Sequence, residues 1–421
     1  MSVKKRLKNF FAPIIQLWKV RLVHRRYEHT LLRLRREYGK RKLRVGFLVS
    51  EEAKWKGQSV YDLMQSSDKF VPIILVYPTK AEMKKSIAIQ KQSVDAMMEF
   101  FRCHEMEVEN IWDYEKQRHV PLEQIDVDIL FYQQTWDLPP APSPAKVASR
   151  ALTFYFPYYL VNYYIPKIET QMRLQHYVYR YIVFSQQQVD LYERTTEKSH
   201  YAGRFVGLGH PIADLFQTQT RQSKSSSKNY VIYAPHFSFP VPNKKRVFGV
   251  STFLDSGRVM LEFAKAHPEI NWVFKPHPRL RRELVDKRVW TKEEVDVYYA
   301  EWENIGESCY TSDYVELFME SKAMITDCGA FLTEYSCTGK PLIHLVPGKM
   351  PAQPNPALEK LYGLFYEAPD NETLLKWLNQ IVIKGEDPRR EERLKCAEEA
   401  GLRNSHAAQN VVNYIDQLMT A

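Results

Sequence analysis

The sequence predicts an α/β protein made of two similar halves, each a parallel β-sheet with helices on its faces. The chain has 421 residues, which exceeds what one hydrophobic core usually holds and suits two domains with a terminal extension. From residue 44 onward, short apolar runs alternate with helical patterns, as is typical of parallel sheets with crossover helices. Residues 217–228 form a polar break rich in serine and lysine, which has the composition of an interdomain linker.

Residues 1–43 differ in charge from the rest of the chain. They contain 14 basic and two acidic residues, a net charge of +12, whereas the whole chain carries +9 and the remainder therefore −3. Apolar residues such as Phe10, Ile14 and Trp18 are interspersed among the basic ones. The pattern predicts a basic amphipathic helical extension, which either lies on an anionic membrane surface or packs on the body of the protein. Nucleic acid is not an expected partner, because no folded reader motif surrounds the basic run.

The first half, residues 44–216, is expected to form an N-terminal Rossmann-like domain. Its predicted strands are residues 45–50, 71–77, 129–132, 181–185 and 205–207, with helices that include 61–65 and 87–101.

The second half, residues 229–421, is expected to form a C-terminal Rossmann-like domain. A cleft between the carboxyl ends of the two facing sheets is where a ligand is expected. The last helix is free to pack back on the first half. Strands are predicted at 230–234, 272–275, 323–326 and 342–346, and helices at 253–266, 314–320, from 331, 372–382 and 391–418.

The cysteines and the apolar runs point to a cytoplasmic protein. Five cysteines are widely spaced and contain no C-x-x-C pair, which indicates neither a disulfide framework nor a zinc site. The sequence has no apolar run of membrane-spanning length and no signal-peptide pattern. With the basic extension, this predicts a cytoplasmic location, peripheral on the inner face of the plasma membrane if the extension binds lipid.

Two motifs after predicted strands of the second half carry basic side chains. In Tyr-Ala-Pro-His, a strand ends and His236 follows on a loop. In Phe-Lys-Pro-His-Pro-Arg, Lys275, His277 and Arg279 leave a strand at alternate positions, on backbone stiffened by two prolines. Such groups suit a pyrophosphate, whose departure needs charge neutralisation or a proton, although His-Pro is also compatible with a plain turn.

A third motif in the second half predicts an anion site at the start of a helix. A strand runs into Thr326 and Asp327, Cys328 and Gly329 follow, and a helix begins at once. The first N–H groups and the helix dipole favour an anion there. Glu334, on this helix, is a candidate acceptor for ribose hydroxyls or else a surface carboxylate.

Several enzyme classes lose support because their motifs are missing. The sequence contains neither a Walker A loop nor a G-x-G-x-x-G fingerprint, which disfavours kinases and NAD(P) dehydrogenases. It has no Asp-x-Asp cluster at a clear strand end. We therefore expect a mechanism without metal or cofactor, in which cationic side chains and a helix terminus neutralise the phosphates.

Candidate acceptor-side residues occur in the first half. Trp136 and Asp137 follow the predicted strand 129–132. Asp137 is a candidate general base for an acceptor hydroxyl, or alternatively a helix cap or turn residue. An aromatic block that contains Tyr155 and Tyr158 either lines the acceptor site or packs in the core.

Taken in order, these motifs resemble those of the CDP-glycerol glycerophosphotransferase family, the teichoic-acid and capsule polymer transferases of GT-B fold. The resemblance covers nearly everything from residue 44 onward. It rests on Trp-Lys-Gly-Gln-Ser-Val-Tyr at 55–61, Gln-Gln-Thr-Trp at 133–136, Tyr-Ala-Pro-His, Phe-Lys-Pro-His-Pro, and Ile-Thr-Asp followed by a helix and Gly-Lys-Pro at 339–341.

The resemblance implies transfer of a polyol phosphate from a CDP-polyol to a hydroxyl of a glycan or lipid-linked acceptor, releasing CMP. It implies that His277 and Lys275 stabilise the pyrophosphate, which Thr326, Cys328 and Gly329 cradle. His236 or Asp137 would then accept the proton of the acceptor hydroxyl.

The sequence departs from the family at two places. Asp137 stands in the position of the family's Trp-His-Gly-Thr histidine, which leaves the identity of the base open. Asp-Cys-Gly-Ala at 327–330 replaces the usual Asp-Tyr-Ser-Ser, so backbone N–H groups must supply more of the phosphate binding.

Three alternatives remain at this point. A glycosyltransferase of the same architecture would use a sugar nucleotide. A UDP-sugar 2-epimerase would share the fold and a Gly-His-Pro motif such as that at 209–211. A catalytically inactive glycan-binding component would keep the cleft without the chemistry.

Overall fold

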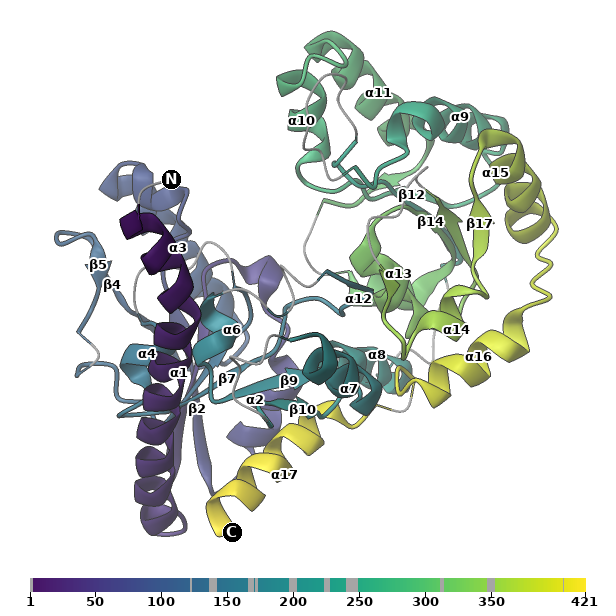
Figure 1. The fold of residues 1–421 in the computed structure, drawn as a ribbon. Helices are drawn as coiled ribbons and strands as arrows, with labels where there is room; N and C mark the ends of the chain where they lie inside the picture. The colour runs from purple at the N-terminus through teal and green to yellow at the C-terminus, as the bar shows by residue number, and fades with distance from the viewer. Residues whose placement is uncertain are drawn as a thin grey trace. The chain divides into compact units, whose positions relative to one another are not determined.

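The computed structural model describes residues 3–121, 123–135, 142–165, 170, 173–196, 203–222, 228–239, 249–310, 314–346, 353–403 and 405–421 (Figure 1). The chain divides into two compact units. The first unit comprises Met1–Leu160, Ile165–Asp214 and His406–Ala421, and the second comprises Val161–Tyr164 and Leu215–Ser405.

The first unit contains a seven-stranded sheet in which all neighbouring strands are parallel. From the central pair β1 and β6, the chain builds outward through β2 and β3 on one side and through β7, β9 and β10 on the other. The boundary between β1 and β6 is therefore the topological switch point, where ligands bind in open α/β sheets. The strand order is β10 (Phe205–Gly207), β9 (Arg180–Val183), β7 (Leu152–Tyr155), β6 (Ile129–Tyr132), β1 (Leu43–Val49), β2 (Phe70–Val76) and β3 (Val108–Asn110).

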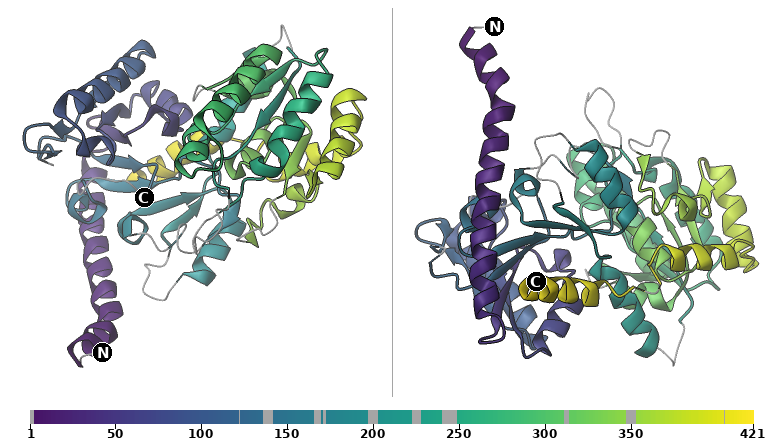
Figure 2. Two further views of the ribbon diagram at one scale, coloured as in Figure 1. Left: turned by 90° about the horizontal axis from the view of Figure 1, so that it is seen from above. Right: turned by 60° about the horizontal axis from the view of Figure 1, so that its bottom comes forward.

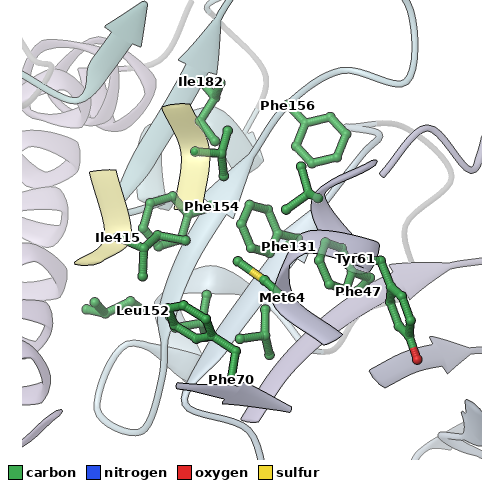
Figure 3. Close-up of a cluster of buried hydrophobic side chains, with 14 of the residues drawn as sticks. Phe47, Tyr61, Met64, Phe70, Phe131, Leu152, Phe154, Phe156, Ile182 and Ile415 are labelled. Atoms are coloured by element: carbon green, nitrogen blue, oxygen red, sulfur yellow. The ribbon is translucent and has the colours of Figure 1, made fainter. Parts of the chain in front are cut away.

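Helices cover this sheet and complete its core. Figure 3 shows the aromatic and aliphatic side chains that meet there, including Phe47, Phe131 and Phe154 from neighbouring strands. The C-terminal helix α17 (Ala407–Thr420) adds Ile415 to this cluster and packs against α1 and α2 (Figures 1 and 2). The other helices are α2 (Gln58–Gln65), α3 (Ile87–Cys103), α4 (Pro144–Val147), α6 (Arg173–Tyr177), α7 (Gln186–Thr195) and α8 (Pro211–Gln222), the last ending in the second unit.

The long N-terminal helix α1 (Val3–Glu37) is partly built into the first unit. Val20, Val23, Tyr27 and Leu34 lie on one helical face and are buried in the core. The Tyr27 hydroxyl lies 3.0 Å from the carbonyl oxygens of Pro144 and Tyr177, which share its single proton, and 2.5 Å from the Thr153 hydroxyl. Of the two alternatives for the basic helix, packing on the body therefore holds for its second half.

The second unit contains a six-stranded parallel sheet with its own switch point, between β11 and β14. Its strand order is β13 (Glu307–Ser308), β12 (Trp272–Phe274), β11 (Tyr230–Ala234), β14 (Ser321–Thr326), β15 (Leu342–Leu345) and β17 (Tyr366–Ala368). The helices are α9 (Phe253–Ala266), α10 (Leu280–Asp286), α11 (Lys292–Ile305), α12 (Val315–Glu320), α13 (Gly329–Ser336), α14 (Glu359–Tyr362), α15 (Asn371–Trp377) and α16 (Arg390–Glu399), with a π-helix at Leu378–Ile383 and a small antiparallel pair, β8 (Tyr163–Tyr164) and β16 (Gln353–Pro354).

The structure differs from the sequence prediction in several elements. The expected linker 217–228 is helical as far as Gln222, and residues 223–227 lie outside the described part. The predicted helix 391–418 is two helices, α16 and α17, because the chain turns at Gly401, whose φ of +73° suits glycine. The charged stretch around Trp302 is helix α11, which begins with a capping box between Thr291 and Glu294. Strands β3, β7, β13 and β17 were not predicted, nor were the short antiparallel pairs β4 (Trp112–Asp113) with β5 (Arg118–His119) and β8 with β16. Among the described residues, no helix has the length and apolar character needed to cross a membrane.

Candidate nucleotide-diphosphate site in the second unit

Three loops of the second unit leave the carboxyl ends of neighbouring strands at its switch point. His236 follows β11, Lys275 to Arg279 follow β12, and residues 327–328 connect β14 to α13. The three motifs predicted from the sequence therefore come from adjacent strands. Because parallel strands end at the same edge of a sheet, their side chains are grouped there.

Asp327 ties two of these loops together. Its carboxylate accepts hydrogen bonds from the backbone N–H of His236 at 2.6 Å and from the backbone N–H of Thr252, at the start of α9, also at 2.6 Å. The side chain is buried, which raises its pKa to about 6, although these two N–H groups favour the charged form. Asp327 was expected in the phosphate-binding turn. Its carboxylate instead binds backbone N–H groups of the protein and positions His236.

The two histidines lie beside each other with Phe237 against them. The rings of His236 and His277 are 5.0 Å apart in an edge-to-face arrangement, and Phe237 lies 4.3 Å from His277. The Arg279 guanidinium lies 4.2 Å from the Phe237 ring centroid and pairs with Glu283. The predicted residues His236, His277 and Arg279 are therefore brought together.

Burial keeps both histidines neutral near pH 7. Desolvation, aided by nearby cations, lowers the pKa of His236 to about 3 and that of His277 to about 4. Nδ1 of His236 accepts from the backbone N–H of Ser238, and Nδ1 of His277 accepts from that of Arg279. Nδ1 of His236 also lies 2.8 Å from the Ser238 hydroxyl. The two N–H contacts favour the tautomer in which each neutral ring carries its proton on Nε2 and donates from there.

Lys275 brings a buried positive charge to the same edge. Its ammonium lies 3.7 Å from the Cys309 sulfur and 5.5 Å from the centroid of the Tyr314 ring. The Tyr314 hydroxyl donates to the carboxylate of Glu334, and both side chains are buried. Lys275 is thereby connected through Tyr314 to α13. Tyr314 was not predicted, and Glu334 is not the surface carboxylate that was one alternative for it.

The turn before α13 is stabilised by its own side chains. The Thr326 hydroxyl donates to the carbonyl oxygen of Ala234 at 2.6 Å and accepts from the backbone N–H of Cys328 at 2.9 Å. A β-carbon on Gly329 would lie 2.5 Å from the side-chain nitrogen of Asn162, so a larger residue here would require the Asn162 amide to move. Asn162, which lies against the first residue of α13, is a second site residue that sequence patterns did not reveal.

The predicted acceptor-side residues of the first unit are placed differently. Trp136 and Asp137 lie outside the described residues. Tyr155 is buried in β7 and packs on Tyr181 with ring centroids 4.6 Å apart, so it belongs to the core and does not line an acceptor site. Tyr158 is half-buried, and its backbone N–H donates to the carbonyl oxygen of Gln133 beyond the end of β6.

Within the described ranges, no group of three or more histidine, cysteine, aspartate or glutamate side chains has the arrangement of a metal site. Apart from Asp327 and Glu334, whose carboxylates accept hydrogen bonds from protein groups, the groups at the second switch point are a buried lysine, a partly exposed arginine, two neutral imidazoles and the start of a helix. All of them favour negative charge on a ligand, which is the chemistry that a diphosphate requires.

No family model and no curated protein matches this chain, whereas solved structures resemble it over most of its length. The UDP-GlcNAc 2-epimerase from Neisseria meningitidis, bound to UDP-GlcNAc, has a TM-score of 0.55 at 14% identity and covers 89% of this chain and 100% of its own. The S. aureus MnaA structure with UDP has a TM-score of 0.56 at 10% identity, with coverage of 90% and 98%. A variant of the wall teichoic acid polymerase TagF has a TM-score of 0.55 at 12% identity, with coverage of 98% of each chain.

At these identities the similarity establishes architecture. Both the polymerase and the epimerases align with nearly the whole chain, including both parallel sheets. The chain therefore has the GT-B fold, with two Rossmann-like α/β sheets and an N-terminal helix.

Proposed function

We propose that the chain is an enzyme that transfers a polyol phosphate, such as glycerol phosphate, from a CDP-activated donor to a hydroxyl of a cell-surface glycan or lipid-linked acceptor. The observation that carries the proposal is the grouping of Lys275, His236 and His277 with the start of α13 at one switch point. The motif resemblance and the structural likeness to a teichoic acid polymerase support the choice of donor.

In this reaction the acceptor oxygen forms a bond to the distal phosphorus of the donor while the bond to the bridging oxygen breaks. CMP leaves with the electron pair. Lys275 would stabilise the charge that develops on the CMP phosphate, and the Nε2–H groups of His236 and His277 would donate to phosphate oxygens. The start of α13, with Gly329, would receive a phosphate on its N–H groups.

The proton of the acceptor hydroxyl needs a separate base. The N–H that Nδ1 of His236 accepts favours a proton on Nε2, a tautomer that donates from Nε2 rather than accepts there. The motif resemblance implied two candidates for this base, His236 and Asp137. The hydrogen bonding of His236 favours Asp137.

A titration tests the role of the histidines. Because an anion beside a histidine favours its charged form, CDP binding should raise the pKa of His277 from about 4 toward the ordinary value of 6.5. NMR of the ring protons, with and without CDP, measures this shift. A pKa for His277 that CDP leaves unchanged would remove it from the donor site.

The second candidate is a UDP-sugar 2-epimerase, which the structural neighbours support to the same degree as the polymerase. The Gly-His-Pro motif at 209–211, which favoured an epimerase, loses weight because of where its histidine lies. His210 of the Gly-His-Pro motif is buried in the first unit, where Nε2 lies 2.6 Å from the Pro157 carbonyl oxygen and Nδ1 accepts from the N–H of Ile212. Both of its nitrogens already serve the fold.

Product analysis separates the candidates. The purified protein is incubated with CDP-glycerol, CDP-ribitol or UDP-sugars, each with and without a glycan or lipid-linked acceptor. Acceptor-dependent CMP release supports the proposal. Release of UDP alone would indicate a glycosyltransferase, interconversion of UDP-sugars without acceptor would indicate an epimerase, and no turnover would indicate a binding component.

We further propose that the first half of α1 places the enzyme on the cytoplasmic face of an anionic membrane. Ile14, Ile15 and Trp18 are 58%, 50% and 65% exposed, and the basic residues Lys19 and Arg21 next to them are also exposed. A helix that binds to a membrane surface typically exposes apolar side chains flanked by basic ones, which contact the acyl chains and the anionic headgroups. This location would suit a lipid-linked acceptor.

Substitution of Trp18 tests the membrane proposal. Trp18→Ser removes a large apolar side chain whose burial contributes roughly 2 kcal/mol, so binding to phosphatidylglycerol-containing vesicles should fall by at least about tenfold. Co-sedimentation measures the change. Leu32→Ser is the control, since Leu32 is also exposed on α1 but lies in the half that packs on the body. Equal loss in both variants, or none, would contradict a specific membrane face.

A further inference from the structure

The switch point of the first sheet carries a set of polar side chains that no part of the proposed donor chemistry uses. Ser50 directly follows β1, and Gln133, Gln134 and Thr135 directly follow β6. β1 and β6 are the two central strands, from which the chain proceeds to opposite edges of the sheet. These four residues therefore lie where an open α/β sheet binds its ligand.

These side chains are buried, but only some of their polar atoms have hydrogen-bond partners. Gln133, Gln134 and Thr135 are 3%, 5% and 8% exposed. In the part of the chain that the structure describes, Nε2 of Gln133, Oε1 of Gln134 and Oγ1 of Thr135 have no hydrogen-bond partner. A buried polar atom without a partner costs about 1–3 kcal/mol, and such atoms are rare in folded proteins. Three in consecutive residues indicate a place prepared for a ligand.

The satisfied half of each amide determines how the other half is presented. Oε1 of Gln133 accepts from the backbone N–H of Lys56 at 2.8 Å, which leaves its NH₂ group as a donor. Nε2 of Gln134 donates to the Ser50 hydroxyl at 2.9 Å, which leaves its carbonyl oxygen as an acceptor. Thr135 adds a hydroxyl that can do either. The set thus offers one fixed donor, one fixed acceptor and one adaptable group.

This combination matches hydroxyl groups better than phosphate. A phosphate accepts only, so the Gln134 carbonyl oxygen would repel it, whereas each hydroxyl of a polyol or sugar both donates and accepts. Ser50, to which Gln134 donates, lines a neighbouring hollow of about 280 Å³ whose other walls include Glu51, Glu52 and Glu82, whereas Gln133, Gln134 and Thr135 do not line it.

We propose that Gln133, Gln134 and Thr135 form a subsite for a neutral, hydroxyl-bearing unit, a polyol or a sugar residue. We assign this unit to the acceptor, and that assignment rests on the transferase function proposed above. The existence of the subsite itself does not depend on the identity of the donor.

The test compares two threonines by the same near-isosteric substitution. Thr135→Val removes a hydroxyl that has no protein partner among the described residues, whereas Thr153→Val removes one that contacts Tyr27 and accepts from the N–H of Tyr179. We expect Thr135→Val to leave the melting temperature unchanged or raised, and Thr153→Val to lower it. A lower melting temperature for Thr135→Val, similar to that of Thr153→Val, would show that the Thr135 hydroxyl serves the fold and would overturn the proposal.

Ligand binding is measured on the full chain by saturation-transfer NMR with glycerol, ribitol and N-acetylmannosamine as probes. At least one probe should bind the wild-type protein, and Thr135→Val and Gln134→Leu should weaken that binding by about tenfold or more. No binding to wild type, or equal binding to the variants, would overturn the subsite. Binding that follows this pattern without CMP release from any CDP donor would sustain the subsite and contradict only the proposed transferase.

Discussion

Replacing Lys275 with methionine is expected to lower the rate of CMP release from CDP-glycerol by about a hundredfold to a thousandfold. Methionine keeps most of the apolar length of the side chain beside Tyr314 but removes the charge. The loss of one preorganised group that stabilises a developing charge typically reduces kcat by about 10²–10³. Steady-state CMP release by the purified variant, with circular dichroism as a check on folding, measures the effect.

The matched control is Lys265→Met in the same unit. Lys265 is on α9, where it pairs with Glu262 and Glu301. Exposed ion pairs contribute little to stability, so this variant should keep both the fold and the rate. A folded Lys275→Met protein with the wild-type rate would contradict a donor site at this switch point.

The parallel sheets were largely predictable because their central strands are short, nearly continuous apolar runs. β7 was not, since it contains part of the aromatic block with Tyr155, whose hydroxyl needs a partner in a buried strand. In the fold, the Thr153 hydroxyl contacts that of Tyr27 on α1, 126 residues away in sequence. A contact between residues so far apart cannot be read from the local sequence, so the polar side chains of β7 hid the fact that it is a buried strand.

In the candidate site, too, residues with a local sequence pattern could be predicted, whereas residues placed by long-range contacts could not. His236, His277 and Lys275 could be identified because each follows a strand, and strand ends determine where loops meet. Tyr314 and Asn162 could not, because they reach α13 from segments with no motif of their own. The sequence indicated where Asp327 would lie, but its role depends on two backbone N–H groups from other segments.

Asp327→Ala should impair both stability and turnover. It leaves the N–H groups of His236 and Thr252 without their acceptor, and each such loss costs about 1–3 kcal/mol, so we expect the free energy of unfolding to fall by roughly 2–4 kcal/mol. The loop that holds His236 would no longer be positioned, and CMP release should fall by about a hundredfold or more. Chemical denaturation and steady-state kinetics measure the two effects.

The dependence of stability on pH separates this positioning role from a generic packing defect. Burial raises the pKa of Asp327 from 3.8 to about 6, so the folded protein binds this proton more tightly than the unfolded chain does. The contribution of Asp327 to stability therefore decreases as pH rises from about 4 to about 6 and is constant above that range. Asp327→Asn keeps the shape and one acceptor but does not titrate, so the decrease should be smaller in this variant, and part of the turnover lost in Asp327→Ala should return. If wild type and Asp327→Asn show the same pH profile of stability, and Asp327→Ala turns over normally, Asp327 neither titrates in the fold nor positions the His236 loop.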